Sequence, residues 1–244
     1  MKIGLIGAGN MAGALARGWG EPVLATDGGS GRAAALVAEL GGEVCTSNAA
    51  LAEQADLVVL GVKPYQLEAI ASEIASSAKR VLSLLGGISV AQLRDAFPGA
   101  EVYLTIPNTP VAVRRGVIVV AEETPLPADV RELLERVGLV VAVPERLMGA
   151  ATATAGVTPA YVALVAEAMI DAAVKHGLKA DLAAQLVVEV LAGSAALLAE
   201  LGGDTLRMRR EVTSPGGSTA RGLAALEHAG LRTAFLDAME AVRG

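Results

Sequence analysis

The stretch Lys2-Ile3-Gly4-Leu5-Ile6-Gly7-Ala8-Gly9-Asn10-Met11-Ala12 decides the fold expected of this chain. It begins as a short apolar run typical of a buried strand and passes into a helical pattern that continues to Trp19. Between them lies G-x-G-x-x-A, the spacing of a dinucleotide-binding turn. Gly7 permits the tight turn, Gly9 lets a pyrophosphate approach the backbone, and Ala12 allows the helix to pack closely on the strand.

The next strand pattern, residues 22–26, is followed directly by an acidic residue. Asp27 follows the glycine turn by about twenty residues, the place at which a carboxylate binds a ribose 2′-hydroxyl and repels a 2′-phosphate. The segment Gly28-Gly29-Ser30-Gly31-Arg32 could form a phosphate nest if Asp27 turned away. We therefore expect either NADPH or NADH as cofactor.

Strand-like and helix-like patterns alternate from the N-terminus to about residue 143. Continuous apolar runs separated by helical segments predict a largely parallel sheet covered on both faces, a Rossmann-type doubly wound α/β domain over residues 1–147. Beyond this domain the apolar residues recur at helical spacing and no segment resembles a strand. This pattern predicts an all-helical domain over residues 148–244. These helices are apolar nearly all round, so we expect a second copy of the chain to cover them in a homodimer. The runs that carry these predictions are residues 57–62, 80–85, 102–106, 116–121 and 140–143 for strands, and 159–176, 180–201 and 219–242 for helices.

Composition excludes several classes of protein. The net charge of −6 in 244 residues argues against a nucleic-acid-binding surface. The single cysteine, Cys45, excludes a disulfide framework and is expected to be a buried packing residue in a reducing compartment. Charged residues and glycines interrupt the apolar stretches, so no transmembrane helix is expected, and the glycine turn arrives too early for a signal peptide. The chain is expected to be cytoplasmic, with no membrane partner and no metal in its site.

Two turns follow predicted strands. Val62-Lys63-Pro64 comes at the carboxyl edge of the sheet, where such sheets bind ligands, so Lys63 is either a ligand contact or a solvated lysine beside a turn. Pro107-Asn108-Thr109-Pro110 is a rigid turn that could aim Asn108 at a nicotinamide or a substrate. A third segment, residues 155–161, opens a long helix whose N-terminus could bind an anion.

A hydroxyl- and glycine-rich loop, Val212-Thr213-Ser214-Pro215-Gly216-Gly217-Ser218-Thr219, lies between two apolar helical patterns. Its glycines expose backbone N–H groups and Thr219 opens the next helix, an arrangement that suits a small carboxylate. The alternative is ordinary turn and capping chemistry, with Ser218 or Thr219 capping a helix that begins near Ala220.

Taken together, these motifs resemble those of the pyrroline-5-carboxylate reductase family in order and spacing over essentially the whole chain. The resemblance implies hydride transfer from NAD(P)H to the C=N carbon of 1-pyrroline-5-carboxylate, which gives L-proline in the last step of proline synthesis. It also implies a dimer through intertwined helical domains, and members of this family often assemble into pentamers of dimers. The motifs that carry it are residues 7–12, 62–64, 107–110, 159–161 and 212–219.

The resemblance also assigns site residues. It implies that the final loop lies at the substrate and that Thr219 is the hydroxyl that gives or relays a proton at the imine nitrogen. No histidine is needed, because a protonated imine is already electrophilic. The substrate-binding residues implied are Ser214, Gly216, Gly217 and Thr219, and the cofactor-binding residues are Gly7, Ala8, Gly9, Asn10, Met11, Asp27, Val62, Lys63, Pro64 and Asn108.

Some positions depart from the family pattern. Ala155-Gly156-Val157-Thr158-Pro159 stands where Ser-Gly-Ser-Gly-Pro is usual, and Arg210 stands where an acidic residue is common. These changes leave two alternatives: a reductase of another cyclic imine, or a non-catalytic NAD(P)-binding regulator. A 3-hydroxyacid dehydrogenase fits poorly, because Lys175 is followed one turn later by Lys179 and not by an asparagine.

Overall fold

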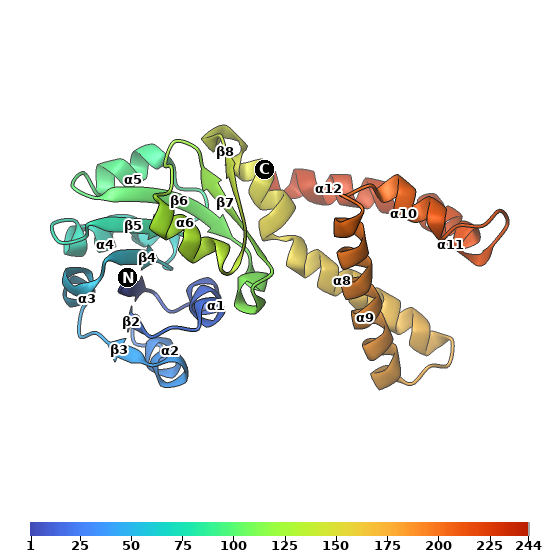
Figure 1. The fold of residues 1–244 in the computed structure, drawn as a ribbon, viewed down its shortest axis with the longest axis horizontal. Helices are drawn as coiled ribbons and strands as arrows, with labels where there is room; N and C mark the ends of the chain where they lie inside the picture. The colour runs from blue at the N-terminus through green and yellow to red at the C-terminus, as the bar shows by residue number, and fades with distance from the viewer. Residues whose placement is uncertain (244) are drawn as a thin grey trace. The chain divides into compact units, whose positions relative to one another are not determined.

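The computed structural model describes residues 1–243 and divides the chain into two compact units, one ending at Pro159 and the other beginning at Ala160. The first unit contains an eight-stranded sheet of order β3-β2-β1-β4-β5-β6-β7-β8 (Figure 1). The order reverses direction at β1, which pairs with β2 on one side and β4 on the other, both in parallel. The strands are β1 Ile3–Ile6, β2 Val23–Thr26, β3 Gly42–Val44, β4 Leu57–Leu60, β5 Arg80–Ser83, β6 Glu101–Pro107, β7 Gly116–Ala121 and β8 Gly138–Val143.

Helices cover both faces of this sheet, as the continuous apolar strands require. One core holds side chains of α1, α2 and α6, and the other holds side chains of α3, α4 and α5. Successive residues of β1 divide between the cores, since Leu5 lies in one and Ile6 in the other. The doubly wound, largely parallel prediction is confirmed. The helices are α1 Asn10–Trp19, α2 Arg32–Leu40, α3 Asn48–Gln54, α4 Leu67–Ile74, α5 Val90–Ala96 and α6 Ala128–Glu135, with short turns η1 Pro64–Gln66, η2 Thr109–Val113 and η3 Glu145–Leu147.

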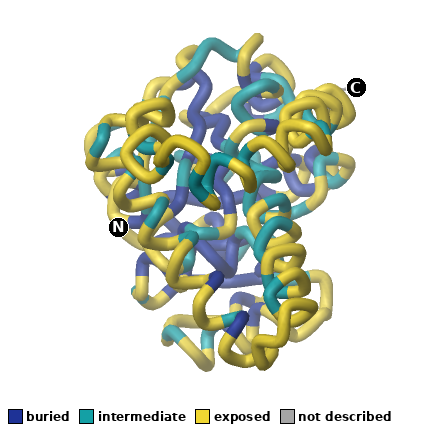
Figure 2. Tube along the Cα trace, turned by 90° about the vertical axis from the view of Figure 1, so that its right-hand side faces the viewer, coloured by how far each residue is buried: buried dark blue, intermediate teal, exposed yellow. Residues whose placement is uncertain are grey.

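Two features of the sheet were not predicted. β7 runs antiparallel to β6, because only the short η2 turn connects them and a parallel crossover needs a dozen or more residues. β3 is an additional edge strand of three exposed residues, too short and too polar to give a sequence pattern. Buried residues, drawn dark blue in Figure 2, include every residue of the central strands β1, β2 and β4. Cys45 is also buried, and burial raises the pKa of its thiol, in keeping with a packing role.

The second unit is helical throughout its described residues. It comprises most of α8 Thr158–Lys175, then α9 Ala180–Glu200, α10 Thr205–Glu211, α11 Ser218–His228 and α12 Leu231–Arg243. The last predicted helical stretch is two helices, because Gly230 adopts a φ of +78° between them. α10 was not predicted; the Asp204 carboxylate caps it by accepting a hydrogen bond from Arg207 N at 2.9 Å.

The apolar side chains of the long helices in the second unit are mostly exposed, because few other residues of that unit pack against them. Among the described residues of α8 to α12, only Ala183 and Val187 are buried, whereas Leu164 is 64% exposed. Two helical stretches, Glu145–Lys175 and Ala180–Glu200, are long and apolar enough by length and composition to cross a membrane. Both stretches meet this test although charged residues interrupt them, as Glu189 does in α9, so the expected interruptions do not by themselves exclude a membrane-spanning length. The test is weak evidence for a membrane span, since apolar helices of soluble proteins also pass it.

Candidate functional site

A cleft of about 500 Å³ lies at the carboxyl ends of β1, β2, β4 and β5, where the strand order reverses. Open parallel sheets bind ligands at this point, because the strand-to-helix turns diverge there and leave a crevice. The cleft is lined by Gly7, Ala8, Gly9, Asn10, Met11, Asp27, Gly28, Ser30, Arg32, Gly61, Val62, Lys63, Pro64, Gln66, Leu84, Leu85 and Gly86. The structure thus brings together nine of the ten residues predicted to bind a cofactor; the tenth, Asn108, does not line the cleft.

The fold itself requires Gly7 and Gly61. Gly7 has a φ of +89°, and a Cβ there would lie 2.9 Å from the Gly61 carbonyl carbon. A Cβ on Gly61 would lie 2.5 Å from Gly7 O and 2.7 Å from the fully buried Ala12 Cβ. The turn after β1 and the end of β4 are therefore in direct backbone contact, and side chains there would force the strands apart.

Three other glycines of the cleft are not required by the fold. Gly9, Gly28 and Gly86 have ordinary backbone angles, and a Cβ would meet only Gly61 O, at 3.6 Å from Gly9, and nothing within 4 Å of the other two. A side chain at any of these positions would extend into open space, so the three glycines leave bare backbone at the cleft. Gly9 is also the N-cap of α1, which has no side-chain cap and no acidic residue in its first turn. That helix terminus suits a pyrophosphate, so the residues present fit a dinucleotide.

Asp27 turns into its own loop at the end of this cleft beside β2. Its Oδ1 accepts a hydrogen bond from Gly29 N at 2.8 Å, and its Oδ2 accepts from Ala33 N at 2.8 Å and from Ser30 Oγ at 3.0 Å. These donors, with Ala33 N foremost, hold the pKa of the Asp27 carboxyl below its usual range. The carboxylate therefore stays ionised at the N-terminal turn of α2.

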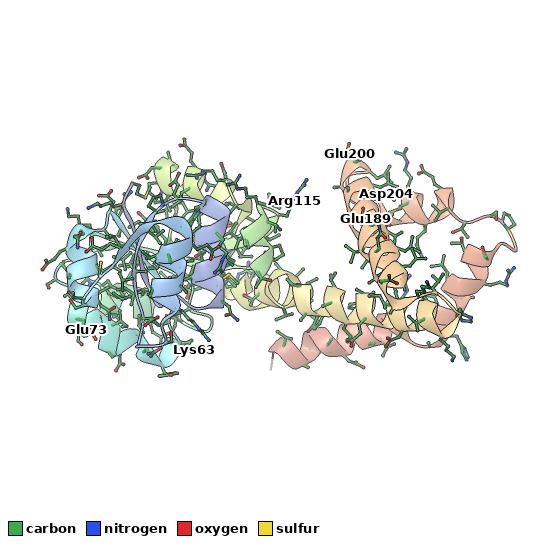
Figure 3. The ribbon with its side chains drawn as sticks, turned by 90° about the horizontal axis from the view of Figure 1, so that it is seen from below. Lys63, Glu73, Arg115, Glu189, Glu200 and Asp204 are labelled. Atoms are coloured by element: carbon green, nitrogen blue, oxygen red, sulfur yellow. The ribbon has the colours of Figure 1, made fainter. Side chains whose placement is uncertain are left out.

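Lys63 lies on the rim of the cleft, where Figure 3 labels it. Its side chain is exposed and makes no ion pair among the described residues, while its backbone N–H donates to Gln66 Oε1 at 3.0 Å. The Gln66 carboxamide thus fixes the turn after β4, with Pro64 opening η1. The lysine presents a free cation to the cleft, although its contact with a cofactor stays a prediction.

Asn108 is a buried bridge between segments of the first unit. Its Oδ1 accepts from Val117 N at 2.8 Å, and its Nδ2 donates to Ala155 O at 3.0 Å. Pro159, four residues after Ala155, has no N–H with which to make the α-helical bond to that carbonyl, and Asn108 donates to it instead. Both ends of the amide are therefore engaged in the fold, and a cofactor role for Asn108 stays a prediction.

The segment before α8 is not the isolated helix N-terminus that the sequence suggested. α7 Met148–Ala151 runs into a π-helical turn, Thr152–Gly156, and from there into α8. The Thr158 hydroxyl donates to Thr154 O inside this helical run. The hydroxyl that replaces a usual glycine is thus used locally, and the expected anion-binding terminus at residues 155–161 is wrong.

The loop before α11 is a type II turn. Pro215 and Gly216 occupy its central positions, Gly216 has the positive φ, +66°, that this turn requires, and Gly217 N donates to Ser214 O at 3.0 Å. Gly217 is the N-cap of α11 and offers no side-chain cap. The helix begins at Ser218, so neither Ser218 nor Thr219 is its N-cap. The alternative interpretation, in which one of these two hydroxyls caps the helix, is therefore wrong.

Three of the four hydroxyls of this loop are free to bind a ligand, whereas the Thr213 hydroxyl donates to Arg209 O. Among the described residues, the structure gives no hydrogen-bond partner to the side chains of Ser214, Ser218 or Thr219. Arg221 Nη1 donates to Gly216 O at 2.7 Å and steadies the turn. Arg207, one of three arginines nearby, pairs with Glu211 at 2.8 Å and is partly neutralised. The four residues predicted to bind substrate thus belong to one turn and the first turn of one helix.

Sequence reasoning missed some lining residues. Leu84, Leu85 and Gly86 follow β5, and Gln66 follows β4. The same rule that selected residues 62–64 could have found the segment after β5, because β5 is the neighbour of β4 in the sheet.

Comparison with known proteins gives a consistent result over both units. Residues 145–243 match the family model described as pyrroline-5-carboxylate reductase dimerisation, and residues 2–87 match NADP oxidoreductase coenzyme F420-dependent. The chain is 34% identical to a pyrroline-5-carboxylate reductase of Methanosarcina acetivorans over 98% of this chain and 94% of that protein. It is 35% identical to one of Synechocystis over 81% and 76%. A crystal structure of Plasmodium falciparum pyrroline carboxylate reductase with NADP bound superposes with a TM-score of 0.86 at 28% identity, covering 100% of this chain and 95% of that one.

Replacing Gly9 with alanine separates ligand binding from folding. Because the added Cβ has room, we expect the free energy of unfolding to change by no more than about 0.5 kcal/mol. The Cβ intrudes where a pyrophosphate approaches, so the Kd for NADH, measured by calorimetry, should rise at least about tenfold. Gly7→Ala is the matched variant at a glycine that the fold requires. It should weaken NADH binding and also lower the free energy of unfolding by about 1–3 kcal/mol, because of the positive φ of Gly7 and its contact with Gly61. Unchanged NADH affinity in Gly9→Ala would contradict the assignment.

Asn108→Ala tests the buried bridge. It leaves Ala155 O and Val117 N without their partner, so unfolding in denaturant at fixed protein concentration should show a loss of about 2 kcal/mol. Adding Pro159→Ala supplies an N–H four residues after Ala155 and should recover part of that loss. A loss below about 0.5 kcal/mol would show that the bridge is dispensable. A rise in the Kd for NADH without loss of stability would instead support the predicted cofactor contact.

Proposed function

The chain belongs to the pyrroline-5-carboxylate reductase family, and we propose that its first unit binds the nicotinamide dinucleotide while the loop before α11 binds the substrate. It is an NAD(P)H-dependent oxidoreductase that reduces the C=N bond of 1-pyrroline-5-carboxylate. The observation that carries this function is the cleft at the β1–β4 reversal, where three glycines that the fold does not require leave bare backbone. The match of residues 145–243 to the family's dimerisation model supports the same conclusion for the second unit.

The cofactor end of the reaction needs positioning more than acid–base chemistry. When bound, a reduced nicotinamide dinucleotide supplies the hydride. Gly9 and the uncapped N-terminus of α1 receive the pyrophosphate, Asp27 faces the adenosine ribose, and Lys63 adds a cation at the rim. Val62 and Pro64 shape the wall after β4. This arrangement orients the dinucleotide along the carboxyl edge of the sheet.

The substrate end is built to hold a carboxylate. The type II turn fixes Ser214 beside the N-terminus of α11, where a helix without a side-chain cap favours negative charge. A Cβ on Gly216 would meet nothing within 4 Å, so the backbone there is open to a small ligand, whereas Ser214 Oγ lies against Gly217. Arg221 donates to Gly216 O and holds the turn. We assign Ser214, Gly216, Gly217 and Thr219 to substrate binding on this basis.

Thr219 is our candidate for the hydroxyl at the ring nitrogen. It stands in the first turn of α11, half-buried and without a protein partner among the described residues. Hydride addition to the imine carbon converts the C=N bond to a C–N bond and leaves its electron pair on nitrogen. A protonated imine needs no further proton to become the neutral amine, whereas a neutral imine takes one, which the Thr219 hydroxyl gives or relays from solvent.

The exposed apolar helices support assembly with further copies of the chain. The family model matched by this region describes dimerisation, and the lack of cover over α8 and α9 supports a homodimer. Glu189 and Glu200, labelled in Figure 3, lie on α9 and interrupt its apolar surface. We further propose a pentamer of dimers, a cytoplasmic location and a role in the last step of proline biosynthesis.

The function is tested by following oxidation of NADH and NADPH with 1-pyrroline-5-carboxylate, and with piperideine-2-carboxylate and a cyclic imine without a carboxylate for comparison. Rapid turnover of the first substrate alone is expected. Preference for the six-membered imine would redirect the proposal to another cyclic imino acid, and turnover without a carboxylate would overturn the carboxylate role of the loop. Cofactor binding with no turnover of any imine would mark a non-catalytic protein.

Thr219→Ala should lower kcat about 100-fold, the size of effect expected when a proton donor in the transition state is lost. The Kd for NADH should stay within about twofold, because Thr219 does not line the dinucleotide cleft. Ser218→Ala removes the adjacent hydroxyl of the same helical turn and is expected to leave kcat nearly unchanged. Equal rates for wild type and Thr219→Ala would remove Thr219 from the mechanism.

A further inference from the structure

We propose that Asp27 makes the cleft selective for NADH, because its own carboxylate occupies the hydrogen-bond donors that would otherwise hold the 2′-phosphate of NADPH. The proposal rests on the proposed function and adds the identity of the preferred cofactor. It concerns the loop from Asp27 to Ala33, between β2 and α2, at the ribose end of the cleft.

The loop is a preformed anion site with an internal occupant. Gly29 N, Ala33 N and Ser30 Oγ all point at one place, and the Asp27 carboxylate takes all three at 2.8, 2.8 and 3.0 Å. Two backbone N–H groups and a hydroxyl at the N-terminus of a nine-residue helix are the donors that phosphate groups use in nucleotide sites. Here the anion that these donors hold is the protein's own Asp27 carboxylate.

The shape of the loop depends on its glycines and leaves the site accessible. Gly29 and Gly31 have φ of +89° and +76°, which let the loop turn tightly, and Gly29 N points at the Asp27 carboxylate. A Cβ on Gly28, Gly29 or Gly31 would meet nothing within 4 Å, so the loop borders open space at these three positions. Gly28, Ser30 and Arg32 line the cleft beside Asp27. A ribose therefore reaches the carboxylate directly.

The two cofactors differ at the atom that meets this carboxylate. A ribose 2′-hydroxyl can donate to Oδ1, which accepts from Gly29 N and, as a carboxylate oxygen, can accept more than one hydrogen bond. A 2′-phosphate is a dianion near neutral pH without a proton to donate, and it would have to displace the carboxylate or lie against it. The three donors that hold Asp27 oppose its displacement, so the phosphate meets a fixed negative charge.

Arg32 makes the selectivity reversible by one substitution. Its exposed side chain lines the cleft and makes no ion pair among the described residues. Once the Asp27 carboxylate is gone, Gly29 N, Ala33 N, Ser30 Oγ and the Arg32 guanidinium form a complete phosphate site. Removal of a single negative charge should therefore convert an NADH site into an NADPH site.

The experiment measures binding by calorimetry, without substrate, for NADH and NADPH and for the fragments AMP and 2′,5′-ADP. Wild type is expected to bind NADH at least tenfold more tightly than NADPH. Asp27→Ala should tighten NADPH binding at least tenfold and weaken NADH binding severalfold, with the same reversal for the two fragments. Asp27→Asn keeps an acceptor oxygen for the loop and should lose most of the discrimination. Asp27→Ala/Arg32→Ala should lose the gain in NADPH affinity.

Asp95→Asn is the matched control, because it removes one exposed carboxylate on α5 outside the cleft and should leave both affinities unchanged. Thermal unfolding checks that each variant is folded. Equal or tighter binding of NADPH by wild type would overturn the proposal and leave the proposed function intact. Unchanged NADH-to-NADPH ratios in both folded Asp27 variants would also overturn it. Failure of wild type to bind either dinucleotide would reject the proposed function together with this inference.

Discussion

The contact between the turn after β1 and the end of β4 is the constraint on which the rest of the first unit depends. Gly7 and Gly61 bring their backbones together so closely that neither position has room for a Cβ, and Ala12 seals the contact from α1. Because β1 and β4 are held at this distance, their following turns diverge into the cleft. The N-terminus of α1 then faces the cleft, and Asp27 reaches it from the neighbouring strand β2. The chemistry of the cleft therefore follows from a packing requirement.

A second set of interactions fixes the other end of the unit. β6 ends at Pro107, and the chain needs Asn108 to join the beginning of β7 to the helical run that leads into α8. Proline at 159 leaves Ala155 O without its α-helical donor, and the carboxamide provides one. A residue that resembles a ligand-binding asparagine in the sequence thus has a structural task, because both its donor and its acceptor are engaged.

The helical unit raises a different problem, which is apolar surface. Its long helices carry alanine, leucine and valine on most sides, and its own helices bury almost none of them. Surface of this kind costs free energy in water unless another surface covers it. The match to a dimerisation model supports our proposal that a second copy of the chain covers this surface. Such association is also a reason for helices of this apolar composition apart from a membrane span.

The sequence by itself determined the doubly wound sheet, the helical C-terminal region, the dinucleotide turn and the family, because these depend on local periodicity and on residues adjacent in the chain. It also located the loop at 214–219, since proline followed by glycine specifies a type II turn locally. Only the tertiary structure decided the antiparallel β7, the use of Asn108 as a bridge, the continuity of the helix through Thr158 and the direction in which Asp27 turns. Each of these depends on which partners lie within hydrogen-bond reach across long stretches of chain or around a loop, and a pattern along the chain does not contain those distances.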